Sequence, residues 1–254
     1  MYVKHIKRRQ LMGAAALLGG LPLCGWPLPA RALAGQIRIV TSHLPPLVVE
    51  NGGLRGGALM EVVEELCKRV RLTPATEFMP WNRALFVSNH APATAIFPVT
   101  RQPDRELKFR WLAQLYEEKY LFLAPKGRSF DVRRPGAMKD RRITLIRGAA
   151  LAVALREMGY LNIVEAGSVD EVHRFLVEGM ADAAFGEQSI VRNALRTRKV
   201  EARFDTSAPV RRTAAWLAGS LDFTPADALM FEQAMKQMHA DGTCLKIFKR
   251  YDMA

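Results

Sequence analysis

A short polar loop that follows an apolar segment holds the residues best suited to binding a small anion. The apolar segment, residues 93–97, leads through Pro98 to Thr100 and then to Arg105. An arginine guanidinium can hold a carboxylate with two parallel hydrogen bonds, and Thr100 adds a hydroxyl and a backbone N–H. Because open α/β sheets bind ligands beyond the carboxyl ends of their strands, the pattern predicts a carboxylate site here. A charged surface turn would use the same residue types.

An aromatic residue is expected at the same edge of the sheet. Trp81 follows a segment expected to form a strand, residues 76–79, and Pro80 opens the next helix. At such a junction its flat face suits stacking on a ligand side chain or a cation. Packing in the core is the alternative role for this tryptophan.

The chain is long enough for two lobes and has the composition of a globular protein. It holds 254 residues, of which 49% are hydrophobic and 24% charged. The net charge is +12, and five of the positive charges lie in residues 1–34, which contain no acidic residue; taking 5 from 12 leaves +7 for the remainder. Those basic residues are spread over several expected elements without a run of five like charges, so a nucleic-acid partner is not expected.

The first 34 residues predict an export signal. A basic start precedes an apolar stretch, residues 11–18, and Ala32-Leu33-Ala34 has the small-x-small pattern of a cleavage site. The apolar stretch is too short and too interrupted to span a bilayer. We therefore expect cleavage after Ala34 and a periplasmic mature protein. The pair Arg8-Arg9 resembles a twin-arginine signal, and an ordinary secretory signal is the alternative.

The rest of the chain alternates strands and helices in two similar halves. Strands are expected at residues 36–41, 76–79, 93–97, 143–146, 162–165 and 182–185, a crossing strand at 115–124 and a returning strand at 214–219. Helices are expected at residues 58–70, 149–158, 169–178 and 225–240 and after Asp241-Gly242-Thr243. A basic region punctuated by proline and glycine, residues 126–142, predicts a boundary between the halves.

Several motifs resemble those of the family 3 extracellular solute-binding proteins, periplasmic receptors that deliver polar amino acids to ABC importers. The resemblance is carried by Thr-Arg-x-Pro-Asp-Arg-Glu at 100–106, Phe-Arg-Trp at 109–111, Pro-Trp-Asn-Arg-Ala at 80–84 and the ending Asp-Gly-Thr at 241–243. It extends from about Ile37 to Tyr251. It implies an α/β fold, the type II periplasmic-binding-protein fold, with a ligand cleft between lobe 1 (residues 35–120 and 214–254) and lobe 2 (residues 121–213).

The resemblance also implies a set of ligand-binding residues in lobe 1. Arg105 would hold the ligand's carboxylate with Thr100 beside it, and Trp81 would form one wall. Leu44 and Pro98 would complete the lining on this side. The family usually has an aromatic residue near Leu44, so this chain departs from the pattern there.

In lobe 2 the resemblance points to a helix start and a carboxylate. Ala149 and Ala150 stand where the family commonly has Thr or Ser, which leaves only backbone N–H groups as donors. Glu187 replaces an aspartate that holds the ligand's ammonium, and its extra methylene makes a standard α-amino acid less certain as the ligand. Asp182 fits a Gly-x-x-Asp-Ala pattern, for which a structural role is expected.

The predicted function is that of a periplasmic substrate-binding protein that captures a small solute with a carboxylate, an amino acid or related organic acid, for ABC-type uptake. The expected partners are that ligand and an ABC permease; the protein is expected to be a monomer without cofactor or metal. A cyclohexadienyl dehydratase-like enzyme on the same fold is an alternative, with Glu187 as acid and Arg101 and Arg105 holding two carboxylates. No lysine, histidine or tyrosine of the cleft motifs supplies an obvious second catalytic group. A sensor domain is a third option.

Two cysteines remain in the chain after the export signal, Cys67 and Cys244. In an oxidising compartment they either form a disulfide or stay buried as free thiols. The resemblance places the C-terminal helix near the helix that carries Cys67, which makes a disulfide a hypothesis worth testing.

Overall fold

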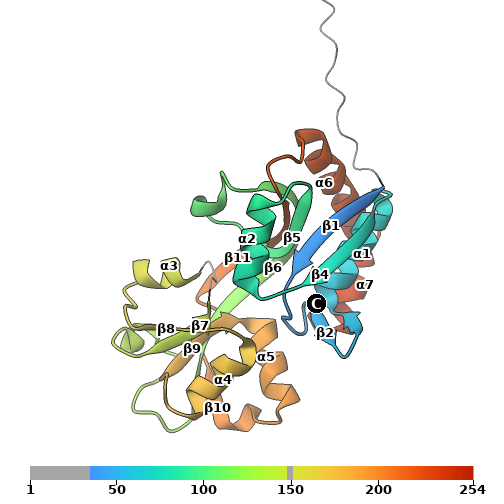
Figure 1. Cartoon of the computed structure of the whole chain (residues 1–254). Coiled ribbons are helices and arrows are strands. Elements are labelled where there is room, and N and C mark those ends of the chain that lie inside the picture. The colour runs from blue at the N-terminus through green and yellow to red at the C-terminus, as the bar shows by residue number, and fades with distance from the viewer. Residues whose placement is uncertain (1–34, 148–150, 254) are drawn as a thin grey trace, which may run out of the picture. The chain divides into compact units, whose positions relative to one another are not determined.

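One nine-stranded sheet runs through the computed structural model, which describes residues 35–147 and 151–253. The strands lie in the order β4-β1-β5-β11-β6-β9-β7-β8, with β10 also paired to β6 (Figure 1). Their bounds are β1 Gln36–Thr41, β4 Thr73–Phe78, β5 Thr94–Thr100, β6 Arg110–Pro125, β7 Ile143–Ile146, β8 Ile163–Ala166, β9 Ala183–Glu187, β10 Phe204–Thr206 and β11 Arg211–Gly219. A separate hairpin joins β2 Val49–Asn51 to β3 Leu54–Gly56.

The helices lie between the strands in sequence and cover the faces of the sheet (Figure 1). Their bounds are α1 Ala58–Arg69, α2 Trp81–His90, α3 Leu151–Glu157, α4 Val169–Val177, α5 Gln188–Thr197, α6 Pro225–Ala240 and α7 Thr243–Arg250. Short 3-10 turns occur at Pro103–Arg105, Pro135–Met138 and Glu201–Arg203. No helix in the described ranges is long and apolar enough to cross a membrane.

The long strand β6 connects two α/β halves. Its residues from Arg110 to Tyr120 pair antiparallel with β11, and those from Tyr120 to Leu123 pair antiparallel with β9. On the β11 side, β4, β1 and β5 run parallel to one another, and on the β9 side β9, β7 and β8 do the same. The carboxyl ends of both parallel sets are therefore the places where a ligand site is expected.

Each half has helices on both faces of its part of the sheet. In the first half, α1, α6 and α7 pack against one face around buried Leu59, Phe97 and Phe231, and α2 packs against the other face at Ala84. In the second half, α3 covers one face, while α4 and α5 cover the other through Leu176 and Leu195 and their neighbours.

Apolar periodicity and capping explain why these helices begin and end where they do. Helix α1 buries Leu59, Val62, Val63 and Leu66, which form one apolar stripe along the helix. Helix α4 begins after Ser168, whose side-chain oxygen accepts from Glu171 N at 3.1 Å. Helix α6 has a reciprocal capping box between Thr224 and Asp227.

Several elements differ from the sequence-based expectation: β4 and β11 begin three residues earlier than expected, and β2, β3 and β10 were not predicted. Two further differences concern the elements that flank the cavity. The crossing strand expected at residues 115–124 begins earlier, at Arg110, because its first residues also pair with β11. Helix α5, Gln188–Thr197, was not predicted at all. It starts directly after β9 without an intervening turn signal, and Glu187 is at once the last residue of the strand and the N-cap of the helix.

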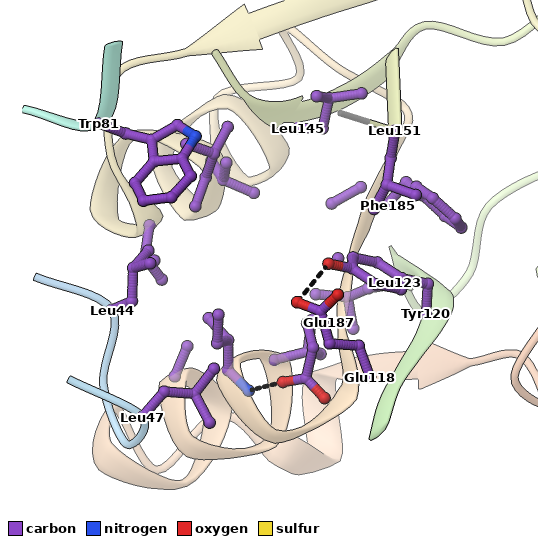
Figure 2. Close-up of a pocket in the computed structure, with 18 of the residues that line it drawn as sticks. Leu44, Leu47, Trp81, Glu118, Tyr120, Leu123, Leu145, Leu151, Phe185 and Glu187 are labelled. Carbon is purple, nitrogen blue, oxygen red and sulfur yellow. Dashed lines mark hydrogen bonds between the residues drawn. The ribbon is translucent and has the colours of Figure 1, made fainter. Parts of the chain in front are cut away.

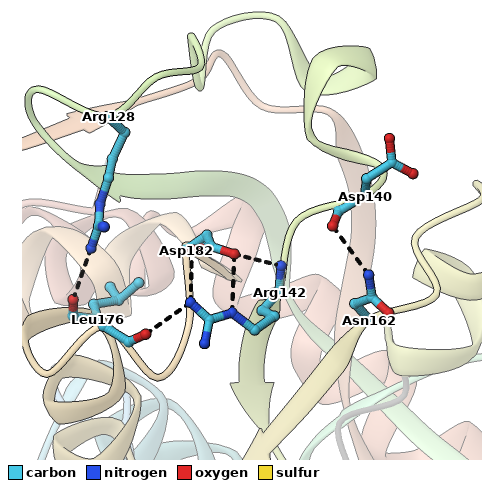
Figure 3. Close-up of polar contacts among 7 residues, drawn as sticks. Arg128, Asp140, Arg142, Asn162, Leu176 and Asp182 are labelled. Carbon is cyan, nitrogen blue, oxygen red and sulfur yellow. Dashed lines mark hydrogen bonds and ion pairs between the residues drawn. The ribbon is translucent and has the colours of Figure 1, made fainter.

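Polar contacts tie the strands of the second half together at their amino ends (Figure 3). The guanidinium of Arg142 binds both carboxylate oxygens of Asp182, and the Arg142 backbone N–H also donates to Asp182 at 2.9 Å. The same guanidinium donates to the Gly179 carbonyl at 2.9 Å. Asp182 thus joins the starts of β7 and β9, which is the structural role expected from the sequence.

The two cysteines are free thiols buried in the first half. Cys67 lies on α1 and Cys244 on α7. The hypothesis of a disulfide between them is therefore wrong for this structure. Burial raises the pKa of Cys67 to about 12 and that of Cys244 to about 11, which keeps both thiols protonated.

Candidate functional site

A cavity lies between the two halves and is lined by residues from both. From the first half come Leu44, Leu47, Trp81, Pro98, Thr100 and Arg105. Strand β6 contributes Glu118 and Tyr120, and the second half contributes Phe185, Glu187 and several aliphatic residues of α4 and α5. Figure 2 shows Trp81, Leu44 and Leu47 on one side, facing Tyr120, Phe185, Glu118 and Glu187.

Six of the eight residues singled out from the sequence line this cavity: Leu44, Trp81, Pro98, Thr100, Arg105 and Glu187. The other two, Ala149 and Ala150, lie outside the described residues. Trp81 therefore lines the same cavity as Thr100 and Arg105 of the polar loop.

Arg105 is the cationic group of the cavity lining. It ends the 3-10 turn Pro103–Arg105, which follows β5, and only 7% of the residue is exposed. Its Nη1 donates to the Thr100 carbonyl at 3.4 Å. Burial lowers the pKa of Arg105, whereas the charges of Asp104, Tyr120 and Glu118 act in the opposite direction. An arginine keeps its charge under such conditions, so the cavity holds a desolvated cation.

Glu118, on the strand shared by the two halves, is a carboxylate that sequence reasoning did not identify. It is 4% exposed, and its two oxygens accept from Thr100 Oγ1 and from Tyr120 Oη, each at 3.0 Å. The pKa of Glu118 is raised to about 7, chiefly by burial and also by the nearby charge of Glu187, although the two hydrogen bonds and the charge of Arg105 act in the opposite direction. Glu118 therefore titrates near neutral pH.

Glu187 has both a structural role and a place in the cavity wall. Its Oε2 accepts from the backbone N–H groups of Ser189 at 2.8 Å and Ile190 at 3.0 Å, which caps α5. Its Oε1 accepts from Tyr116 Oη at 3.2 Å. Burial raises the pKa of Glu187, and these hydrogen bonds partly offset the effect. One carboxylate thus caps a helix and lines the cavity.

Two tyrosines that lie outside the sequence motifs of the cleft contact these acids. Tyr120 donates to Glu118, and Tyr116 donates to Glu187. Both sit in the interior of β6, so no motif at a strand end marked them. The alternating pattern of β6 was the one available signal, because it places Tyr116, Glu118 and Tyr120 on the same face of the strand.

Arg101, considered from the sequence, and His43 do not line this cavity and make their contacts elsewhere. Arg101 does not line the cavity; it makes a two-bond ion pair with Glu106 at 2.7 and 2.9 Å. Its guanidinium also lies over the rings of Trp111 at 5.2 Å and Trp216 at 4.9 Å. His43 is exposed, and its Nδ1 accepts from Glu50 N at 3.0 Å.

Comparisons with solved structures identify the fold. An ancestral arginine-binding protein bound to arginine matches with a TM-score of 0.77 at 13% identity, over 87% of this chain and 99% of that one. The substrate-binding protein of an amino acid ABC transporter gives a TM-score of 0.75 at 13% identity, over 85% and 99%. A histidine kinase sensor domain with similarity to periplasmic binding proteins gives 0.77 at 13%, over 85% and 95%.

The chain has the two-lobe fold of the periplasmic binding proteins. This agrees with the α/β fold class expected from the sequence. At 13% identity the likeness establishes the fold alone. No family model matches the chain, and no curated protein matches its sequence.

Proposed function

We propose that this protein binds a small solute carrying a carboxylate, an amino acid or related organic acid, and delivers it for ABC-type uptake. The observation that carries the proposal is the convergence of Arg105, Glu118 and Glu187 on one buried cavity. These groups come from the first half, the shared strand and the second half. Solved structures with this fold include an arginine-binding protein and a substrate-binding protein of an amino acid ABC transporter.

The buried guanidinium of Arg105 is the proposed carboxylate partner. A two-bond contact between arginine and a carboxylate is strong and directional, and a cavity with little water strengthens it. An ammonium on the ligand would meet Glu118 and Glu187, which lie in the same wall. Because Arg105 and Glu187 belong to different halves, a ligand held by both would favour closure of the two lobes around β6 and β11.

The proposed lobe boundaries, export and partner rest on the sequence analysis. Lobe 1 would comprise residues 35–120 and 214–254, and lobe 2 residues 121–213. The export signal, residues 1–34, lies outside the described residues; its cleavage would release a periplasmic monomer that meets an ABC permease in the inner membrane. In the enzyme alternative Arg101 and Arg105 would hold two carboxylates; the position of Arg101, paired with Glu106 outside the cavity lining, does not favour it.

A binding screen tests this function. Purified protein is heated with each member of a panel of amino acids and organic acids, and every compound that raises the melting temperature is then titrated by calorimetry. We expect at least one carboxylate to bind, with affinity reduced by substitution of Arg105. Turnover of prephenate or arogenate by the same protein, or binding restricted to compounds without a carboxylate, would contradict the proposal.

A further inference from the structure

The part of the cavity that extends into the second half has almost entirely apolar walls. Its lining includes Leu123, Leu145 and Phe185 from strands β6, β7 and β9 and Val172, Leu176 and Leu195 from helices α4 and α5. Five of these six are buried, and Val172 is half-buried. Figure 2 shows Leu123, Leu145, Leu151 and Phe185 around the space beyond the two carboxylates.

The charged groups of the lining gather at the other end. Thr100 links two of them, because its carbonyl accepts from Arg105 and its hydroxyl donates to Glu118. Tyr120, which donates to Glu118, pairs in register with Glu187 across β6 and β9. The cavity therefore has a polar end suited to the ligand's head and an apolar end available for its tail.

Among the described residues of the apolar end, His173 is the one with an ionisable side chain. It lies on α4, and burial together with the charge of Arg198 lowers its pKa, so the imidazole is neutral at pH 7. No aspartate, glutamate, lysine or arginine lines that end in the described part of the chain. A charged tail entering it would be desolvated without an ionic partner, which is costly.

We propose that the cavity selects carboxylate ligands whose tail is uncharged and apolar, aliphatic or aromatic, over those with a charged tail. The inference rests on the proposed function, since it assumes that Arg105 holds the carboxylate head. Burial of an aliphatic or aromatic tail against leucine, valine and phenylalanine side chains supplies the favourable term. This specificity differs from that of the arginine-binding protein that shares the fold.

A second, more polar hollow adjoins the cavity and offers a charged tail another place to go. It is lined by Ser42, His43, Asp170, Asn193, Thr197 and Arg198 and shares Trp81, Val169 and Ala194 with the cavity. Its acidic residue, Asp170, is already in an ion pair with Arg198. A cationic tail would have to displace that arginine, so this hollow does not favour a ligand such as L-arginine.

A series of ligands with one head and different tails tests the inference. L-Leucine, L-phenylalanine, L-arginine and L-glutamate are titrated into the wild-type protein by calorimetry. We expect L-leucine or L-phenylalanine to bind at least tenfold more tightly than both charged amino acids. Equal or tighter binding of L-arginine or L-glutamate would overturn the inference and leave the proposed function intact. If none of the four amino acids binds, and 4-methyl-2-oxopentanoate does not bind either, the inference and the proposed amino-acid ligand are both overturned.

A substitution that fills the apolar end gives an independent test. Ala194 lies on α5 and lines the cavity, so Ala194→Phe places a ring where the tail is proposed to lie. We expect this variant to weaken L-leucine binding at least tenfold. The matched control is Ala226→Phe, at an exposed position of α6 outside the cavity lining, which leaves affinity unchanged. If Ala194→Phe shows a cooperative melting transition and binds L-leucine as tightly as the wild type does, the ligand's tail lies elsewhere and the inference is wrong. If the variant does not fold, the ligand series on the wild-type protein tests the inference by itself.

Discussion

The Thr100 hydroxyl donates a hydrogen bond of 3.0 Å to Glu118 Oε2 and thereby joins the end of β5 to the strand shared by both halves. The Thr100 carbonyl in turn accepts from the Arg105 guanidinium at 3.4 Å, so Thr100 links the side chain of Arg105 to this strand. The proposed carboxylate site and the connection between the halves are thus one hydrogen-bonded unit.

The first prediction concerns the pH dependence of stability that arises from Glu118. Its pKa is about 7 in the folded protein against a usual 4.5, so between these values the folded state binds more protons than the unfolded state. The contribution of this group is therefore most favourable below pH 4.5 and is lost as pH rises through 7. Glu118→Gln keeps a hydrogen-bond acceptor but carries no charge. The difference in free energy of unfolding between this variant and the wild type should therefore be more favourable to the variant at pH 8 than at pH 5, by up to about 3 kcal/mol.

Urea unfolding of the wild type and Glu118→Gln at the two pH values measures this difference. Glu117→Gln is the matched control, because Glu117 is the neighbouring residue of β6 and its side chain is 55% exposed in contact with Arg212. Its effect should be within about 0.5 kcal/mol at both pH values. A Glu118→Gln effect that is the same at pH 5 and pH 8 would show that the carboxyl is ionised at both.

The second prediction compares two neighbouring arginines. Arg105→Ala should weaken the tightest carboxylate ligand of the screen by about 2–5 kcal/mol, because that carboxylate is left unpaired in a desolvated cavity. Arg105→Lys should restore little, since a point charge cannot reproduce the two-bond contact. Arg101→Ala should change the binding free energy by less than about 1 kcal/mol, because Arg101 is exposed and paired with Glu106.

Calorimetry on the three variants tests this comparison, with melting temperatures recorded to confirm that each is folded. The assignment of the carboxylate site would be wrong if Arg101→Ala abolished binding while Arg105→Ala preserved it.

The third prediction concerns the contact between Arg142 and Asp182 in lobe 2. The Arg142 side chain is 49% exposed and that of Asp182 20%, so solvent screens the pair, and we expect Asp182→Asn to cost about 1 kcal/mol at pH 7. The contact lowers the pKa of Asp182 below its usual 3.8, so its contribution is present above that value and is lost as pH falls through the lowered pKa. The penalty should therefore shrink in acid, as measured by denaturant unfolding at pH 7 and pH 3. Asp131→Asn, at an exposed pair with Arg133, should leave the midpoint unchanged.

The fourth prediction counts thiols. The chain from Gly35 onward, unfolded without reductant, should react with two equivalents of a thiol reagent, because Cys67 and Cys244 are free. In the folded state both should react slowly, since burial keeps them protonated. A count of zero in the unfolded chain would reveal a disulfide that the structure does not contain.

The fifth prediction concerns export. The pattern Ala32-Leu33-Ala34 predicts a mature chain that begins at Gly35. Intact-mass measurement of the protein recovered from the periplasm should give the mass of residues 35–254. Recovery of the full 254-residue chain there would refute the cleavage site.

The contrast between Arg105 and Glu118 shows which parts of the site were accessible from sequence. Arg105, Thr100 and Trp81 follow the ends of strands, where local composition changes from apolar to polar and the edge of the sheet is recognisable. Glu118 lies in the middle of β6, and its burial results from pairing with β11 and from packing near Glu187, both distant in sequence. A glutamate in a strand, here next to Glu117 and Lys119, predicts an exposed position, so tertiary context was needed to find the buried one.

The helices show the same distinction. Helices α1 and α6 were predicted nearly to the residue, because each has a regular apolar stripe and α6 has Pro225 at its first turn. Helix α5 follows β9 directly, and its cap, Glu187, is not among the residue types that usually mark a helix start. Only the structure shows that Glu187 caps this helix, by accepting hydrogen bonds from the backbone N–H groups of Ser189 and Ile190.

The placement of the tryptophans gives the protein an optical reporter of its own. Of the three tryptophans after residue 34, Trp81 lines the cavity, whereas Trp111 and Trp216 contact each other edge to face at 5.9 Å and do not line it. A ligand that covers the Trp81 indole would change the polarity around that ring and leave the surroundings of the other two as they are. The emission spectrum of the unlabelled protein should therefore report occupancy, and Trp81→Phe should silence the signal.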